Sequence, residues 1–500
     1  MDVLNGLIGG FAVALQPMNL LWCLVGVALG TVVGIMPGLG PPATIAMLLP
    51  LTFLMNPASA MIMLAGIYYG AKYGGSTTAI LLNVPGESAS VATCIDGYQM
   101  ARKGRAGPAL GIAAIASFIA GTVGVIGLML VAPPLAKMAL AFSSPEYFAL
   151  MSLGLAMVVL LAGKSMVKAL LATLVGLWIS SIGIDPFSTA DRFTFGQLEL
   201  LSGVDFVVVA IGVFALGEVL ANMEGREAAM SLPVPKGLRN LLPSRQDLKD
   251  CRFAFANGSI LGFLIGVLPG AGSTIASFIC YGVEKAVSRR PEAFGTGVPE
   301  GVAAPEGANN SETGGALVPM LTLGIPGSGT TAILLAALVL WGFKPGPLFI
   351  PENPALFWSL VASMYVGNLM LLVLNLPLVP LFAQVLRTPV FLLYPLIFGV
   401  SIVGVFSTSG SLFDVWLLAL FGLAGYLMRK LDYPAAPLIL GLVLGGALER
   451  ALRQSLMMSD GSLSILVTRP ISAVMLSFTA LILLVPVFNR FNRWRLRALE

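Results

Sequence analysis

The chain has 500 residues, of which 57% are hydrophobic and only 10% are charged, and its mean hydropathy is +0.92. Soluble domains carry charge on about a quarter of their residues, so this composition excludes an ordinary soluble globular protein. The net charge is +4 and histidine is absent, which excludes Ser-His-Asp triads and histidine zinc sites.

The apolar runs are continuous, which favours an all-α polytopic membrane protein over a β-barrel with its short alternating strands. The first run, residues 4–15, follows no basic stretch, so we expect it to be retained and not cleaved as a signal peptide. Four cysteines stand singly without CxxC spacing and are interpreted as packing residues: Cys23, Cys94, Cys251 and Cys280.

The run over residues 19–35 leads into a break rich in glycine and proline, which includes Gly38 and Gly40 and is followed by Thr44. Proline removes a helical hydrogen bond and glycine permits positive φ, so a helix is interrupted here. The next apolar piece, residues 44–54, covers about 16 Å, roughly half of a ~30 Å hydrocarbon core. We therefore expect a re-entrant half-helix.

The apolar residues 60–69 lead into a stretch that contains Ser76, Thr77 and Thr78. A further apolar run then precedes a second break, which holds Asn83, Pro85 and Gly86. Further spans are expected over residues 109–131, 148–161, 167–184 and 206–220, and residues 224–252 form a polar linker with several prolines.

The second half of the chain repeats these signals in the same order. The pattern Gly34, Pro37, Gly38, Gly40 recurs 232 residues later as Gly266, Pro269, Gly270, Gly272. Gly74-Gly75 recur as Gly314-Gly315 at an offset of 240, and Pro85-Gly86 recur as Pro326-Gly327 at an offset of 241. A common order with slowly drifting offsets predicts an internal duplication.

Basic residues cluster at 102–105, 226–252 and 490–497, and the positive-inside rule places these segments in the cytoplasm. Counting spans from the first cluster puts its copy in the second half outside, as in inverted repeats. We predict two inverted repeats with re-entrant hairpins and broken helices, making about 10–12 crossings. The expected divisions are an N-terminal apolar segment (1–17), a first transmembrane repeat (18–222), a polar cytoplasmic linker (223–252), a second repeat (253–448), and a C-terminal span with a basic tail (449–500).

A helix that begins inside the membrane points free N–H groups and its positive dipole end at whatever lies before it, which suits carboxylate groups. The predicted substrate-binding residues are Gly38, Gly40, Thr44, Ser76, Thr77, Thr78, Gly270, Gly272, Ser273, Thr274, Asn310, Gly327, Ser328 and Thr330. Unwound carbonyls and half-helix C-termini suit Na⁺. The predicted cation-binding residues are Asn83, Pro85, Gly86, Glu312 and Gly324. No cofactor and no metal other than Na⁺ is expected.

These residues also have purely structural interpretations, which the sequence leaves open. A Pro-Gly break can simply kink a helix for packing, and membrane hydroxyls often bond carbonyls of their own helix. Lys72 could pair with an anionic substrate, but the tyrosines around it favour a position at the membrane interface. Glu87 and Glu312 could take up protons or bind Na⁺, or could also lie at an interface.

The motifs resemble the large membrane subunit of tripartite tricarboxylate transporters, the TctA family. The resemblance covers roughly residues 18–440 and includes Gly34-x-x-Pro37-Gly38-Leu39-Gly40-Pro41, Tyr73-Gly74-Gly75-Ser76, Asn83-Val84-Pro85-Gly86-Glu87 and Gly266-x-x-Pro269-Gly270-Ala271-Gly272. It implies a secondary-active importer in the bacterial inner membrane, with the C-terminus in the cytoplasm. It also implies Na⁺ or H⁺ coupling, citrate-like di- and tricarboxylate substrates, a small membrane subunit and a periplasmic solute-binding protein.

The sequence therefore predicts a transporter with alternating access, in which one helical group moves against the other, as in an elevator. An ion channel that uses the same broken helices as a filter is the alternative. A membrane-embedded enzyme is disfavoured, because histidine and clustered acid pairs are missing. No nucleic-acid partner is expected, since the basic tail fits a cytoplasmic anchor.

Overall fold

The computed structural model of the chain describes the backbone of residues 3–36, 40–161, 165–224, 237–382, 384 and 390–497. The side chains of residues 238, 390–393 and 485–497 lie outside this description. The described chain is almost entirely helical and divides into two compact units. Unit 1 comprises residues 1–136 and 207–427, and unit 2 comprises residues 137–206 and 428–500.

The first part of unit 1 consists of the following helices: α1 (Val3–Ala14), α2 (Pro17–Ile35), α3 (Pro41–Thr52), α4 (Pro57–Leu82), η1 (Ser88–Ser90), α5 (Val91–Met100), η2 (Ala101–Arg105) and α6 (Ala106–Ala139), whose last turn passes the unit boundary. Proline stands at the first position of α2, α3 and α4, where its missing N–H has no intrahelical partner to lose. The short α3 confirms a half-length helix after the first break.

The second part of unit 1 consists of a larger set: α9 (Phe206–Ala210), η4 (Ile211–Leu216), α10 (Gly217–Glu224), α11 (Leu238–Leu241), α12 (Arg245–Asp250), α13 (Arg252–Gly266), α14 (Gly272–Val287), η5 (Pro291–Ala293), α15 (Glu300–Leu323), α16 (Gly329–Leu340), α17 (Phe349–Glu352), α18 (Pro354–Asn375), α19 (Val379–Phe382), α20 (Val390–Ser409) and α21 (Leu412–Lys430). The predicted polar linker thus contains two short helices, α11 and α12, and Ser244 caps the second.

Unit 2 consists of α7 (Ser144–Leu161), α8 (Met166–Ser180), strands β1 (Gly183–Ile184) and β2 (Asp191–Arg192), η3 (Leu198–Leu200), α22 (Ala435–Met458), α23 (Ile465–Thr468) and α24 (Pro470–Arg497). The strands pair antiparallel, with Gly183 opposite Arg192. The span predicted over residues 167–184 is therefore too long at its end. It stops at Ser180, because Gly183, with φ of 118°, turns the chain into β1.

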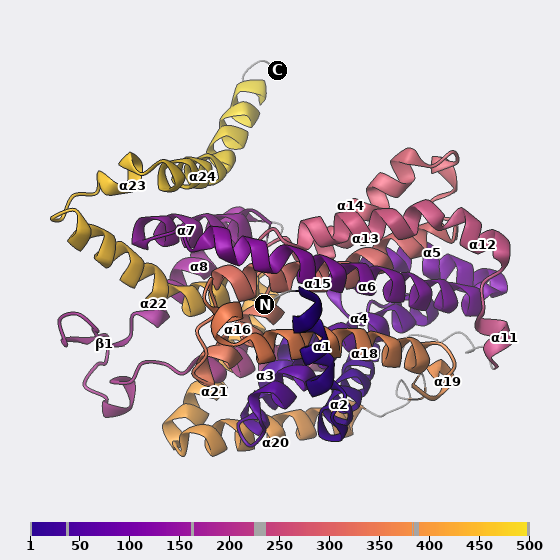
Figure 1. Cartoon of the computed structure of the whole chain (residues 1–500), viewed down its shortest axis with the longest axis horizontal. Coiled ribbons are helices and arrows are strands. Elements are labelled where there is room, and N and C mark those ends of the chain that lie inside the picture. The colour runs from indigo at the N-terminus through magenta and orange to yellow at the C-terminus, as the bar shows by residue number, and fades with distance from the viewer. Residues whose placement is uncertain are drawn as a thin grey trace. The chain divides into compact units, whose positions relative to one another are not determined.

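Two helix pairs in unit 1 pack by the same pattern. Helix α2 lies along α4, and α13 lies along α15 (Figure 1). A Cβ at any of three glycines of α2 would overlap a carbonyl oxygen of α4: Gly26 on Met63, Gly30 on Ile67 and Gly34 on Ala71. A Cβ at any of three glycines of α13 would overlap α15: Gly258 on Ala304, Gly262 on Ala308 and Gly266 on Glu312. These glycines therefore let the paired backbones touch.

The offsets between these matching residues are constant: 232 residues from α2 to α13 and 241 residues from α4 to α15. Both long helices also end on a left-handed residue, Asn83 with φ of 57° and Gly324 with φ of 70°. The structure corrects one detail of the sequence comparison. Gly74 approaches Gly34 as Gly315 approaches Gly266, so Gly74 corresponds to Gly315 and not to Gly314.

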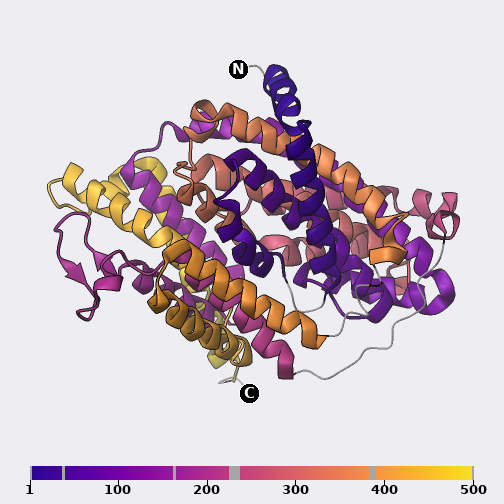
Figure 2. The same ribbon diagram turned by 90° about the horizontal axis from the view of Figure 1, so that it is seen from below.

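Seven helical segments among the described residues are long and apolar enough to cross a membrane: Pro17–Ile35, Ser88–Ala139, Ser144–Leu161, Phe206–Glu224, Pro354–Asn375, Leu412–Lys430 and Ala435–Met458. Several shorter apolar helices accompany them, including α3, α13 and α16. Figure 2 shows the helices of the chain from a second side. The chain is thus a multi-pass α-helical membrane protein. The expected 10–12 crossings stay a prediction, since they depend on how the short helices pair.

Candidate functional site

Chain breaks from the second half of the sequence meet in unit 1. The break between α13 and α14 turns at Gly270, with φ of 85°, and the backbone N–H of Gly270 donates to the carbonyl oxygen of Gly327 at 2.9 Å. Gly327 lies in the break between α15 and α16. Helix α16 then begins with a capping box, in which Ser328 and Thr331 bond each other's backbone N–H groups. The two breaks therefore support each other through the main chain.

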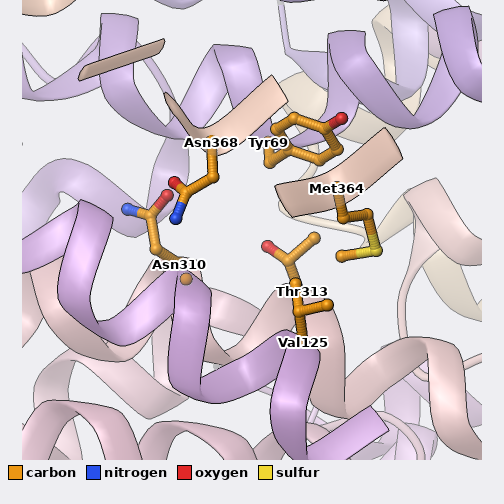
Figure 3. Close-up of a pocket in the computed structure, with 7 residues that line it drawn as sticks. Tyr69, Val125, Asn310, Thr313, Met364 and Asn368 are labelled. Carbon is orange, nitrogen blue, oxygen red and sulfur yellow. The ribbon is translucent and has the colours of Figure 1, made fainter. Parts of the chain in front are cut away.

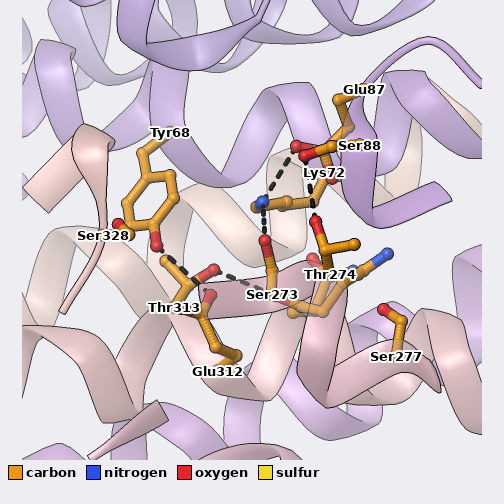
Figure 4. Close-up of polar contacts among 12 residues, drawn as sticks. Tyr68, Lys72, Glu87, Ser88, Ser273, Thr274, Ser277, Glu312, Thr313 and Ser328 are labelled. Carbon is orange, nitrogen blue, oxygen red and sulfur yellow. Dashed lines mark hydrogen bonds and ion pairs between the residues drawn. The ribbon is translucent and has the colours of Figure 1, made fainter. Parts of the chain in front are cut away.

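A buried lysine joins these breaks to one from the first half. Lys72 projects from α4, and its side chain is only 3% exposed. Its Nζ donates to Glu87 Oε2 at 2.9 Å and to Ser273 Oγ at 2.6 Å (Figure 4). Glu87 ends the break after α4, and Ser273 lies in the first turn of α14. Lys72 is therefore not a lysine that extends its ammonium group to water, because a carboxylate inside the protein holds that group.

A second carboxylate lies in the same neighbourhood. Glu312 of α15 is fully buried and accepts a hydrogen bond from Tyr68 Oη at 3.2 Å, and Nζ of Lys72 lies 5.5 Å from the Tyr68 ring centre (Figure 4). One carboxylate oxygen of Glu87 and one of Glu312, Oε1 in each case, are buried without a hydrogen-bond partner. When ionised, the cluster holds two carboxylates and one ammonium. We call Tyr68, Lys72, Glu87, Ser273 and Glu312 the Lys72 cluster.

The halves of the chain also touch beside this cluster. Thr274 Oγ1 donates to Ser88 Oγ at 3.0 Å, which joins the first turn of α14 to η1 (Figure 4). Gly86 packs so closely that a Cβ there would overlap the carbonyl oxygen of Gly34, and the Cβ would lie 2.6 Å from Thr78 Oγ1. The break after α4 is therefore held against the end of α2.

The structure brings together several residues that the sequence nominated. Gly270, Ser273, Thr274, Gly327, Ser328 and Glu312 lie in or beside the Lys72 cluster, and Gly272 precedes Ser273 with φ of 63° and open space around it. Pro85 and Gly86 lie in the break that carries Glu87. Gly324 ends α15 and donates its N–H to the carbonyl oxygen of Pro319.

Other nominated residues lie apart or have other partners. Gly40 and Thr44 begin α3, where the nearest charged group to a Cβ at Gly40 is Glu218, and no described hydrogen bond joins them to the Lys72 cluster. Asn83 is exposed. Gly38, which was predicted to bind substrate, lies outside the described residues.

Hydroxyl groups in the C-terminal part of α4 bond their own helix. Ser76 donates to the carbonyl oxygen of Tyr73 at 2.7 Å, and Thr78 donates to that of Gly75 at 3.1 Å. Thr77 is buried beside them, and Thr330 is buried in the first turn of α16. Local bonding of Ser76 and Thr78 is the simpler of the two interpretations that the sequence left open.

A further buried carboxylate was not predicted from the sequence. Glu306 of α15 is fully buried and accepts hydrogen bonds from Thr93 and, at 3.1 Å, from Asn309 Nδ2. None of the described ion pairs joins it to a lysine or arginine. Asn310 continues the network, since its Nδ2 lies 2.6 Å from Asn309 Oδ1 and 2.8 Å from Ser117 Oγ. A charge in the middle of an apolar helix was the one available signal.

A family model described as the tripartite tricarboxylate transporter TctA family matches residues 20–440. The chain belongs to this family. The match confirms the resemblance seen in the motifs and covers α2 through the start of α22. The Lys72 cluster lies within the matched region, so it belongs to the transporter body.

Two relatives of the TctA chain come from Agrobacterium vitis. One, described as "Uncharacterized 52.8 kDa protein in TAR-I ttuC' 3'region", is 48% identical over 477 residues, which is 95% of each chain. The other, described as "Uncharacterized protein in TAR-II ttuC' 3'region", is 44% identical over 215 residues, which is 43% of this chain and 89% of the relative. No solved structure matches significantly.

Proposed function

We propose that this TctA chain is the large membrane subunit of a secondary-active, cation-coupled importer of di- and tricarboxylates in the bacterial inner membrane. In this proposal a small membrane subunit accompanies it, and a periplasmic solute-binding protein delivers the substrate. The observation that carries the proposal is the buried ammonium of Lys72, held between Glu87 and the first turn of α14.

The Lys72 cluster supports binding of a carboxylate. A substrate carboxylate placed between Lys72 and the start of α14 would receive a full positive charge, the Ser273 hydroxyl and the positive end of a helix dipole. In the structure Glu87 takes that place on Lys72. A substrate therefore has to displace Glu87 from the ammonium group, and Glu87 then needs another positive partner.

That exchange provides a coupling mechanism. The cluster has one more carboxylate than ammonium groups, and the Oε1 atoms of Glu87 and Glu312 are buried without partners. Na⁺ ions or protons bound by these oxygens, one for each carboxylate, would neutralise Glu87 and Glu312 and free Lys72 for the substrate. Without these cations, the substrate would leave two buried carboxylates uncompensated, which is costly in a region of low dielectric constant.

The repeated packing of α2 on α4 and of α13 on α15 supports two repeats around this site. In the proposal the repeats are inverted and α13 with α14 forms a re-entrant hairpin, with Gly270 near its tip. Access would alternate as the group holding the site moves against the rest, as in an elevator, with the C-terminus in the cytoplasm. The Gly270–Gly327 and Ser88–Thr274 contacts are those such a movement would rearrange.

The test is uptake of labelled citrate and succinate into proteoliposomes that contain both membrane subunits and the solute-binding protein. Imposed Na⁺ and pH gradients are compared with no gradient. We expect uptake above the equilibrium level that needs one of the two gradients and the binding protein. Flux that only equilibrates substrate, whatever the gradient, would contradict the proposal and favour a channel.

A further inference from the structure

A small cavity lies among four helices of unit 1, apart from the Lys72 cluster, with room for about one water-sized particle. Helices α4, α6, α15 and α18 line it with Tyr69, Gly121, Val125, Asn310, Thr313, Met364 and Asn368 (Figure 3). None of these residues is charged. The figure shows the side chains of Asn310, Thr313 and Asn368 facing one shared space.

The amide of Asn368 is fixed by its donors. Its Nδ2 donates to the carbonyl oxygen of Phe118 at 2.9 Å and to Thr122 Oγ1 at 3.1 Å. Its Oδ1 accepts from Tyr73 Oη at 2.7 Å and keeps a further lone pair. A Cβ at Gly121 would lie 3.0 Å from this oxygen, so the glycine keeps the oxygen open to the cavity.

The other polar groups of the cavity also donate elsewhere. Asn310 Nδ2 lies within hydrogen-bond distance of Ser117 Oγ, Asn309 Oδ1 and the carbonyl oxygen of Glu306. Its two N–H groups therefore have acceptors that are not among the residues lining the cavity. Thr313 Oγ1 donates to the carbonyl oxygen of Asn309 at 3.3 Å, and Tyr69 Oη donates to that of Ser363. The cavity therefore presents oxygen lone pairs and no free N–H or O–H group of these side chains.

The buried acidic residue near the cavity is Glu306, and the negative charge of its ionised form would suit a cation. The carboxylate of Glu306 accepts from Asn309 Nδ2, and Asn309 Oδ1 in turn accepts from Asn310 Nδ2. These hydrogen bonds connect Glu306 to the amide that borders the cavity. None of the described ion pairs joins Glu306 to a lysine or arginine, so a positive charge in the cavity would be stabilised when this carboxyl group is ionised.

We propose that this cavity binds one small monovalent cation of the size of Na⁺, with Asn310 Oδ1, Thr313 Oγ1 and Asn368 Oδ1 as ligands. Neutral oxygen ligands suit a hard monovalent ion, whereas a divalent ion would need carboxylates in contact. The proposal rests on the proposed cation coupling and gives it a second site. Thr313 follows Glu312 on α15, so the ion would fix the helix that carries the coupling carboxylate.

The chain offers a matched pair of variants. Thr313 and Thr322 are both buried on α15, and each donates its hydroxyl to the carbonyl oxygen four residues earlier. Only Thr313 lines the cavity. Thr313→Val therefore removes one proposed ligand, while Thr322→Val repeats the same chemical change and the same loss of a local hydrogen bond elsewhere on the helix.

The experiment follows thermal unfolding of the purified full chain while NaCl replaces choline chloride at constant ionic strength. We expect Na⁺ to raise the unfolding temperature of wild type and of Thr322→Val with the same half-saturating concentration. In Thr313→Val and Asn310→Ala that concentration should rise by about tenfold or more. An unchanged Na⁺ response in both variants, or none in wild type, overturns the proposal and leaves a cavity that holds only water.

Citrate uptake in the same preparations separates this proposal from the proposed function. Gradient-driven uptake with an unaltered Na⁺ dependence in Thr313→Val would refute the cavity site while the transport function stands. Na⁺ stabilisation that Thr313→Val weakens, in a protein without concentrative uptake, would support the site while the transport function fails.

Discussion

Removing the charge of Lys72 is the sharpest perturbation that the structure offers. The side chains of Lys72 and Glu87 are both only 3% exposed, and their charged atoms lie 2.9 Å apart. Lys72→Met keeps most of the apolar stem but leaves Glu87 as a buried carboxylate without its ammonium partner. Breaking a buried ion pair from one side costs about 3–5 kcal/mol, so we expect the free energy of unfolding to fall by that amount.

Because Glu87 is the partner of Lys72, the ion pair can be tested with a double-mutant cycle. Glu87→Gln alone should also destabilise the protein, since Lys72 then keeps a buried charge. The double variant Lys72→Met with Glu87→Gln should recover to within about 1–2 kcal/mol of wild type, because replacing both charges removes the uncompensated ion. Lys285→Met changes an exposed lysine on α14 and should stay within about 0.5 kcal/mol.

The assay is denaturant unfolding in detergent micelles followed by circular dichroism, with citrate uptake measured on the same variants. Uptake should be lost in the double variant although its stability returns, since the ammonium proposed to bind substrate is gone. Single variants within about 1 kcal/mol of wild type, or a double variant as unstable as the singles, would refute the view of Lys72 and Glu87 as a buried pair.

Two further predictions concern packing and pH. Gly30→Ala and Gly262→Ala should each cost about 1–3 kcal/mol of unfolding free energy, because each Cβ meets a carbonyl oxygen of the paired helix, whereas Gly282→Ala, with open space around it, should be neutral or stabilising. Equal values for all three would contradict the close packing. In unit 2, backbone N–H groups of Phe187 and Ser188, followed by Arg453, lower the pKa of Asp185 from 3.8 to about 2. The ionised carboxylate therefore stabilises the fold above about pH 4, and this contribution is lost as the pH falls through 2. Asp185→Asn should flatten the fall in stability over that window, and an unchanged profile would show that Asp185 has no such role.

The repeated glycine pattern could be predicted from the sequence because these glycines are in contact with backbone. Gly34 and Gly266 were matched by pattern alone, and both prove to lie against a carbonyl oxygen where no Cβ fits. A helix interface of this kind tolerates only glycine, so the spacing survives in both halves. The sequence match paired Gly74 with Gly314, one residue away from its structural counterpart Gly315. Each half has two adjacent glycines at this point, and only the packing of the helices shows which of them correspond.

The centre of the site could be predicted only in part. Ser273 and Thr274 were found because they follow a break that restarts a helix. Lys72 was assigned to the interface because its sequence neighbours are tyrosines, while its partners come from residues 15 and 201 positions away. Asn368 has no local signal, since an asparagine in an apolar helix reveals neither its donors nor its cavity.

Cross-linking tests most directly whether breaks from both halves of the chain meet on the substrate path. Ser88 and Thr274 have their hydroxyl oxygens 3.0 Å apart, so cysteines at both positions should form a disulfide in a background without Cys23, Cys94, Cys251 and Cys280. We expect this disulfide to stop citrate uptake and a reductant to restore it. Failure of the pair to cross-link, or full uptake with the disulfide formed, would contradict it.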